Sequence, residues 1–114
     1  MTQEATPASI VYCTVPDGAL ADALSGTLVQ EGLAACVHVF PVGKSVYVWE
    51  GKLERSTEHL LMIKSRQALY PRLQARLREL HPYQVPEILA VPVTAGLPEY
   101  LTWLARATSG PDSA

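Results

Sequence analysis

The sequence predicts an α+β domain with a ferredoxin-like plan, in which two helices cover one face of an antiparallel four-stranded sheet. Its 114 residues are enough for one domain, and 48% apolar with 18% charged residues is typical of a chain with a packed core. β-type runs and amphipathic helical runs follow each other in the order β-α-β-β-α-β, with one further helix at the end. We expect the domain to span residues 9–107, with flexible tails at 1–8 and 108–114.

The first strand and the first helix are indicated by local signals. Residues 9–15 form a short β-type run that is broken by a Pro-Asp pair. Asp17 is a favourable N-cap because its carboxylate can accept a hydrogen bond from a free backbone N–H of the first turn. Gly32 stands where helices commonly end in a left-handed residue. The helix between these two residues has an apolar stripe at Leu20, Leu24 and Leu28.

Three extended segments are expected next. Residues 33–40 alternate between two faces that are both largely apolar, which is typical of a strand in the centre of a sheet. Residues 45–50 and 53–65 are predicted as two long strands of a hairpin. The turn is placed at Gly51-Lys52, because glycine in the first central position favours a type II′ turn.

The length of this hairpin predicts an oligomer. A strand rises ~3.3 Å per residue, so the second arm alone outreaches the body of a domain this small. One face of a ferredoxin-like sheet is also left uncovered by its own helices. The hairpin tip carries apolar side chains that are unfavourable in water: Tyr47, Val48 and Trp49. We therefore predict that the hairpin pairs with a neighbouring subunit and closes a ring.

The second half of the chain completes the pattern. A helix is predicted at 67–80, with Pro71 in its first turn. A proline-rich loop ends this helix, a buried strand is expected at 87–93, and a last helix at 98–107.

Charge and cysteine content exclude several classes of protein. The net charge of −2 argues against nucleic acid and against anionic membranes as partners, since both require a basic surplus. No apolar stretch approaches the ~20 residues of a membrane span, and the N-terminus has no signal-peptide pattern, so a cytoplasmic location is the default. The arginines of the 67–80 segment are interpreted as a solvated helix face. Cys13 and Cys36 are too few for a disulfide scaffold.

A few residues could carry chemistry, and each has a plainer interpretation. Cys13 shares a face of the first strand with two valines, so a buried apolar role is favoured over metal ligation. His81 follows the second helix and either interacts with the helix C-terminus or binds a ligand. Cys36 and His38 lie on one face of a strand, where they could share a metal, but packing is the simpler explanation. His59 is expected at the solvent or at an interface.

The loop that begins at His81 is the most distinctive segment. Two prolines stiffen it while it presents an imidazole, the phenol of Tyr83 and the carboxylate of Glu87 within a few residues. The plainer interpretation is a helix-to-strand turn whose Glu87 pairs with a nearby lysine or arginine.

Four sequence motifs, together with the terminal Tyr100-Leu101-Trp103-Leu104 pattern, resemble the CutA divalent-cation tolerance family over about residues 10–107. The motifs are Tyr12-Cys13-Thr14-Val15-Pro16-Asp17, Gly32-Leu33-Ala34-Ala35-Cys36-Val37, Val46-Tyr47-Val48-Trp49-Glu50-Gly51-Lys52-Leu53-Glu54 and Leu80-His81-Pro82-Tyr83-Gln84-Val85-Pro86-Glu87-Ile88.

The resemblance implies a stable homotrimer similar in plan to the PII signalling proteins, located in the bacterial cytoplasm and without catalytic activity. It implies a link to copper and other divalent metals. The cysteine and the second histidine of a copper-binding family member correspond to Cys13 and His81, whereas Leu80 stands at the position of the first histidine. Copper or another divalent cation is thus the expected cofactor, with Cys13 and His81 as metal ligands.

Two other functions stay open at this stage. A PII-like sensor would bind a small molecule between subunits, and the aromatic hairpin tip and the rigid loop give the candidates Trp49, Lys52, Tyr83 and Glu87. An enzyme using His81 or Glu87 as general acid or base is disfavoured, because no nucleophile or cofactor motif accompanies them.

Overall fold

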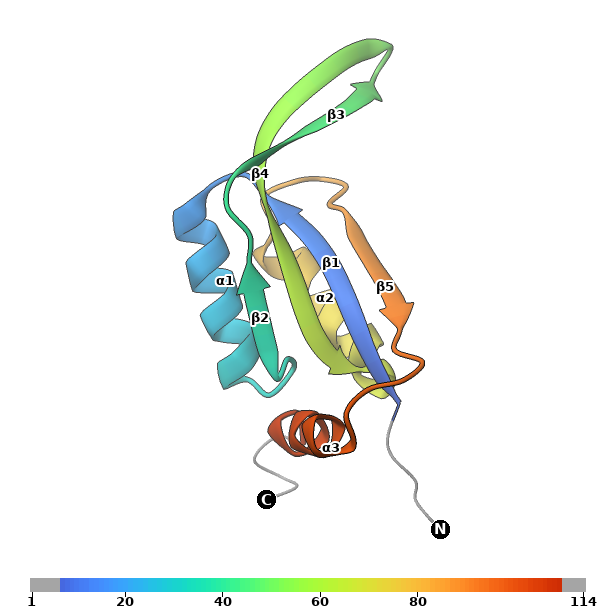
Figure 1. Cartoon of the computed structure of the whole chain (residues 1–114). Coiled ribbons are helices and arrows are strands. Elements are labelled where there is room, and N and C mark those ends of the chain that lie inside the picture. Colours follow the sequence, from blue (N-terminus) through green and yellow to red (C-terminus); the bar gives the residue numbers. More distant parts are fainter. Residues whose placement is uncertain (1–6, 110–114) are drawn as a thin grey trace.

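The computed structural model describes residues 7–109 and confirms the ferredoxin-like plan. All strand pairs are antiparallel, and the main sheet has the order β2-β4-β1-β5 (Figure 1). The elements are β1 (Ala8–Val15), α1 (Gly18–Gln30), β2 (Cys36–Val39), β3 (Gly43–Trp49), β4 (Lys52–Arg66), the short 3-10 helix η1 (Gln67–Leu69), α2 (Tyr70–Leu80), β5 (Ile88–Pro92) and α3 (Pro98–Ala107).

The core lies between one face of the sheet and the helices α1 and α2. Alternate residues of β1 and β4 point into it, as expected from the two-residue period of a strand. Asp17 caps α1 as predicted, because its Oδ1 accepts a 2.8 Å hydrogen bond from the backbone N–H of Leu20. The core residues include Val11, Cys13, Val15, Leu24, Leu28, Leu61, Ile63, Leu73 and Leu77.

The third helix covers only one end of the opposite sheet face. Leu104 of α3 packs on Ala8 and Ala35 in a small separate cluster. The Arg66 guanidinium ties the end of this helix to the sheet by donating to the hydroxyl and the carbonyl of Thr108, at 2.9 and 2.8 Å. The predicted tails lie mostly outside the described residues, and their inner members Ala8 and Thr108 are buried.

Two sequence predictions about β2 are wrong. The strand spans Cys36–Val39 instead of 33–40, and it lies at the edge of the sheet instead of its centre. The N–H groups of Leu33 and Ala34 are used to end α1, where both donate to the carbonyl of Leu28, so they cannot begin a strand. One face of β2 is apolar because Val37 packs against the main core, whereas Cys36 and His38 lie on the face opposite α1 and α2.

The predicted hairpin turn is also wrong. Trp49 pairs with Lys52, which makes Glu50 and Gly51 the two central residues in place of Gly51-Lys52. Their φ angles are 50° and 80°, and positive values at both positions are typical of a type I′ turn, not of type II′. Glycine thus occupies the second central position.

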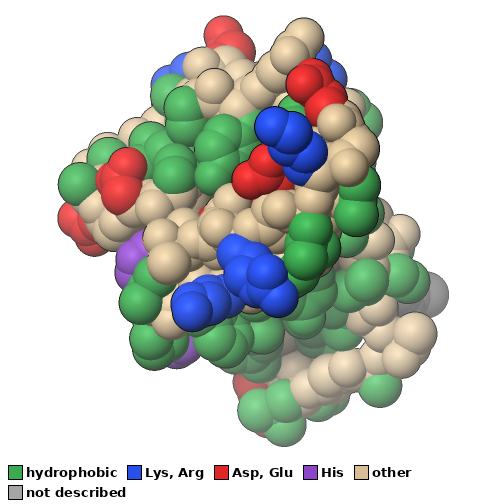
Figure 2. All heavy atoms as spheres, turned by 90° about the horizontal axis from the view of Figure 1, so that it is seen from above, with side chains coloured by type: hydrophobic (Ala, Val, Ile, Leu, Met, Phe, Trp, Pro, Cys, Tyr) green, Lys and Arg blue, Asp and Glu red, His purple; other side chains and the backbone are tan. Residues whose placement is uncertain are grey.

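The hairpin of β3 and β4 extends well beyond the body of the domain (Figure 1). The chain measures 53 × 26 × 24 Å, and its radius of gyration of 15.2 Å exceeds the value of about 13 Å expected for a compact chain of this length. Viewed from the hairpin end, broad apolar areas lie between a few charged groups (Figure 2). Val46, Val48 and Leu53 of the hairpin are each more than half exposed.

Candidate functional site

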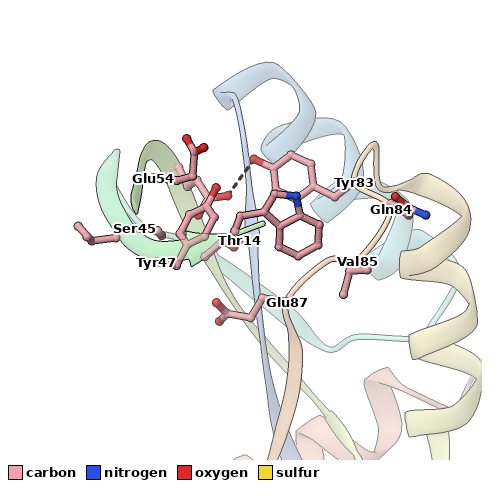
Figure 3. A pocket seen from close by; sticks show the side chains of 11 residues that line it. Thr14, Ser45, Tyr47, Glu54, Tyr83, Gln84, Val85 and Glu87 are labelled. Atoms are coloured by element: carbon pink, nitrogen blue, oxygen red, sulfur yellow. Dashed lines mark hydrogen bonds between the residues drawn. The ribbon is translucent and has the colours of Figure 1, made fainter. Parts of the chain in front are cut away.

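A cavity of about 570 Å³ lies between the hairpin and the loop that connects α2 to β5 (Figure 3). We call it the hairpin cavity. Figure 3 shows Ser45, Tyr47 and Glu54 of the hairpin on one side of the site and Tyr83, Gln84 and Val85 of the loop on the other. The lining residues are Thr14, Ser45, Val46, Tyr47, Trp49, Glu54, Glu58, Tyr83, Gln84, Val85 and Glu87.

His81 fixes the loop against the end of β1. Its Nδ1 accepts a hydrogen bond of 3.1 Å from the backbone N–H of Tyr83, so Nδ1 carries no proton. Its Nε2 lies 2.7 Å from the carbonyl oxygen of Thr14 and therefore carries the proton and donates it. The ring is buried, and both nitrogens are occupied by the chain's own backbone. The ring is also in contact with that of Tyr83, with 4.7 Å between the centroids.

Tyr83 links the loop to the hairpin. Its hydroxyl donates a 2.8 Å hydrogen bond to Oε2 of Glu58, which is drawn as the dashed line in Figure 3. Partial burial, together with this bond and the negative charge of Glu58, raises the pKa of Tyr83 to about 12. The phenol is therefore a permanent donor at neutral pH. Across the cavity, the hydroxyl groups of Tyr47 and Ser56 are hydrogen-bonded at 2.7 Å, which orients the Tyr47 ring.

The lining of the hairpin cavity is acidic. Glu54, Glu58 and Glu87 belong to it, whereas it contains no lysine or arginine. None of the three carboxylates takes part in an ion pair within residues 7–109, where the ion pairs join Arg76 to Glu31 and Glu79. The plainer interpretation of Glu87, a pairing with a neighbouring basic residue, is therefore wrong. The lining favours a positively charged ligand.

Cys13 lies beneath the cavity and not in it. Its side chain is fully buried in the main core. Burial raises the pKa of the thiol to about 12, and the charges of Glu87 and Glu58 add to the rise. A neutral thiol is a weak metal ligand, so metal binding at Cys13 and His81 would require loss of a proton from one residue and of a hydrogen bond from the other.

The structure brings three of the four predicted small-molecule residues together. Trp49, Tyr83 and Glu87 line the hairpin cavity, whereas Lys52 pairs with Trp49 at the tip of the hairpin and does not line it. Glu54 and Glu58 were missed by sequence reasoning. Their alternation along β4 is visible in the sequence, but only the hairpin register places both of them opposite the loop.

The remaining candidate residues have structural roles. Cys36 and His38 share the uncovered face of the sheet, at register positions opposite Lys64 and Met62. His38 packs edge to face against Phe40, in agreement with the packing interpretation. His59 Nδ1 lies 3.0 Å from the carbonyl oxygen of Phe40, which ties β4 to the segment after β2.

Two structural properties limit what this chain can do by itself. No three histidine, cysteine or acidic side chains among residues 7–109 are close enough to share one metal ion. Within the same residues, no helix has the length and the apolar character needed to cross a bilayer.

Comparisons with known proteins agree with the fold. Residues 9–107 match the family model described as "CutA1 divalent ion tolerance protein". The chain is 43% identical to the chloroplastic protein CutA of Arabidopsis thaliana, an alignment that covers 94% of this chain and 59% of the relative. It is 42% identical to the divalent-cation tolerance protein CutA of Thermus thermophilus, with 87% and 96% covered. The crystal structure of CutA1 from Oryza sativa superposes with a TM-score of 0.89 at 41% identity, covering 91% of this chain and 95% of that one.

The relatives differ in length and in location. The chain spans about three fifths of the length of the curated plant relatives but nearly all of the Thermus protein. The Arabidopsis thaliana relative is named chloroplastic. A similar structure from Archaeoglobus fulgidus is named periplasmic. It is 32% identical to this chain, its TM-score is 0.87, and the alignment covers 90% of this chain and 99% of that one. The names describe tolerance proteins and not enzymes. With a family match over residues 9–107 and 42% identity to a bacterial member, the chain belongs to the CutA1 divalent ion tolerance protein family.

Proposed function

We propose that the protein is a noncatalytic, cytoplasmic homotrimer that binds cations, divalent metal ions among them, in the hairpin cavity. One observation carries this proposal: three carboxylates line the cavity, and no basic side chain does. Divalent metal ions prefer oxygen ligands when they are hard, and they often use only one or two carboxylates together with water. A divalent metal ion can therefore bind in the cavity without three protein side chains that contact the same ion.

The experiment is a calorimetric titration of the protein with MnCl₂ and with CuCl₂. Glu87→Gln and Glu54→Gln are each expected to weaken binding severalfold, because each removes a negative charge from the lining of the cavity. Glu99→Gln in the first turn of α3 removes the same charge outside the cavity and serves as the control. If the three variants bind both metals as the unmodified protein does, the cavity is not the cation site.

The pair Cys13 and His81 remains a second candidate for copper, supported by the family resemblance. In this protein both ring nitrogens of His81 are occupied and the thiol of Cys13 is neutral, so we expect this pair to bind copper more weakly than the cavity does. A Cys13→Ser/His81→Ala double variant that loses copper while the Glu87→Gln variant keeps it would assign the metal to the pair.

The trimer is supported by the surfaces that the single chain leaves uncovered. The hairpin projects from the body, and the sheet face opposite α1 and α2 exposes Leu89 and Val91. A partner subunit that covers both would bury apolar surface at roughly 25 cal/mol per Å². The hairpin cavity would then lie close to the contact between subunits, as expected for the PII-like arrangement.

A small-molecule sensor is the second candidate function. The observation in its favour is that Trp49, Tyr83 and Glu87, chosen from the sequence as ligand-binding candidates, line a single cavity. The acidic lining directs the choice of ligand away from anionic metabolites and toward cations.

A further inference from the structure

The hairpin cavity combines aromatic rings with carboxylates, and a metal ion has no use for the rings. Three aromatic side chains line it, from Tyr47, Trp49 and Tyr83, together with three carboxylates. The negative faces of aromatic rings attract ammonium groups, and a hydrocarbon chain packs on the same rings. At about 570 Å³ the cavity also lies within the range of pockets for small organic ligands.

The carboxylates are distributed around the cavity and do not converge. Glu54 belongs to β4 and Glu87 to the approach to β5, and Figure 3 shows their side chains on different sides of the cavity. Within the described part of the chain, no three acidic, histidine or cysteine side chains could surround one metal ion. Negative charges that are spaced apart match a ligand whose positive charges are also spaced apart.

Glu58 is an independent sign of a cationic ligand. Only 6% of this residue is exposed, and Tyr83 donates to its Oε2. The other carboxylate oxygen has no hydrogen-bond donor among residues 7–109, and no lysine, arginine or histidine there forms an ion pair with it. Among the described residues, the buried side-chain oxygen that lacks a partner belongs to Ser25, so the second oxygen of Glu58 is accessible and free to pair with a cation in the cavity that Glu58 lines.

We propose that the hairpin cavity binds an organic cation with two or more ammonium groups joined by a hydrocarbon chain. The ammonium groups would pair with Glu58 and with Glu54 or Glu87, and the chain would lie on the aromatic rings. This inference rests on the proposed function of the cavity as a cation site and specifies the chemical class of its ligand.

The test follows the fluorescence of Trp49 in a Trp103→Phe variant, which makes it the only tryptophan of the chain. Spermidine and 1,4-diaminobutane are titrated in 0.15 M NaCl, where non-specific attraction of exposed charges is screened. We expect a saturable change with both amines, weaker binding of the monoamine butylamine, and no change with the uncharged 1,4-butanediol. Equal affinity for butylamine and 1,4-diaminobutane, or no saturable change with either polyamine, would overturn the proposal.

Substitutions distinguish this ligand from a metal ion. Glu58→Gln keeps an oxygen for the Tyr83 hydroxyl, and Glu58→Gln and Glu87→Gln are each expected to weaken spermidine binding by about tenfold. Tyr47→Leu is expected to weaken spermidine roughly threefold and to leave Mn²⁺ binding unchanged, since the ring is no metal ligand. Glu99→Gln is the charge control. If the protein binds Mn²⁺ at the cavity but not spermidine, this inference fails while the proposed function stands; if it binds neither, both fail.

Discussion

His81 is the residue that decides the shape of the candidate site. The family resemblance predicts it to be a metal ligand, but its two ring nitrogens hold the backbone at Thr14 and Tyr83. The sequence left two roles open for it, interaction with the helix end or ligand binding. The structure adds a third role, which is to hold the loop to the end of β1 through the backbone of Thr14 and Tyr83. The sequence could not predict this role, because it does not show which backbone groups a histidine in a proline-rich loop will contact.

Replacement of this histidine tests its structural role. We expect His81→Ala to lower the free energy of unfolding by about 1–3 kcal/mol, because it leaves the Thr14 carbonyl and the Tyr83 N–H without partners. Denaturant unfolding followed by circular dichroism gives the value. Gln74→Ala, at an exposed position on α2, is the control and is expected to change stability by less than about 0.5 kcal/mol. Equal effects of the two variants would contradict the anchoring role.

The two cysteines differ in a way that thiol chemistry can measure. Cys13 is fully buried, and its pKa of about 12 leaves almost no thiolate at neutral pH. In a Cys36→Ser variant, where Cys13 is the only thiol, we expect no reaction with an aromatic disulfide reagent at pH 7 until denaturant is added. A rise in pH from 7 to 9 increases the thiolate fraction, but burial continues to exclude the reagent. Rapid reaction of the native variant at pH 7 would show that β1 opens.

The residues that line the cavity show which contacts a sequence predicts and which it does not. Asp17 was predicted as an N-cap correctly because capping depends on neighbours three residues away. Glu58 was not predicted because its burial depends on Tyr83, 25 positions along the chain. Long-range contacts of this kind need the sheet register, which a single sequence does not determine.

At the scale of elements, the helices and the long strands were predicted to within two residues, except that 67–69, predicted as the start of the second helix, form the 3-10 helix η1. Amphipathic periodicity and proline positions identify α2 and α3, and Pro71 lies in the first turn as expected. The prediction that the strand at 87–93 is buried is wrong, because β5 lies at the edge of the sheet and four of its five residues are exposed.

The other errors occur where two signals compete. In the apolar run at 33–40, the alternation predicts a strand, but Leu33 and Ala34 donate to the carbonyl of Leu28 and end α1. In the hairpin, Gly51 fits either of two turn types, and only the pairing of Trp49 with Lys52 decides between them.

Two glycines allow the hairpin turn to be tested separately from side-chain packing. An added Cβ would meet no atom within 4 Å at either Gly51 or Gly26, but only Gly51 has a positive φ, of 80°. We expect Gly51→Ala to destabilise the protein by about 1–2 kcal/mol because alanine avoids this conformation. Gly26→Ala in the middle of α1 should instead stabilise it, by up to about 1 kcal/mol. Thermal unfolding of the two variants compares them, and a Gly51→Ala variant as stable as the unmodified protein would rule out a strained turn.

At the scale of the whole molecule, the single chain leaves apolar surface uncovered. The hairpin extends from a small body, and its exposed apolar side chains lie beyond the reach of its own core (Figure 1). A monomer with a surface of this kind would be prone to association. In a closed ring, the same apolar surface of every copy is covered by a neighbour. The length of the hairpin and its apolar tip already favoured such an oligomer in the sequence.

A charge placed in the hairpin tests this arrangement. Light scattering is expected to give three times the chain mass of 12.4 kDa for the unmodified protein. Val48 is 67% exposed in the single chain, so Val48→Glu should have little effect on a monomer. If a neighbouring subunit covers Val48, the buried charge is strongly unfavourable and the ring should dissociate or weaken.

A matched variant separates the interface from the general effect of a new charge. Val29 on α1 is 43% exposed and lies away from the hairpin and from the open sheet face. Val29→Glu should therefore keep the mass of the unmodified protein at every concentration, while Val48→Glu shifts toward the monomer mass on dilution. A Val48→Glu protein that keeps the larger mass, with unchanged thermal stability, would place the hairpin outside the contact. The cation site would then have to be completed by the single chain alone, from the carboxylates of Glu54, Glu58 and Glu87 and the aromatic rings that line the hairpin cavity with them.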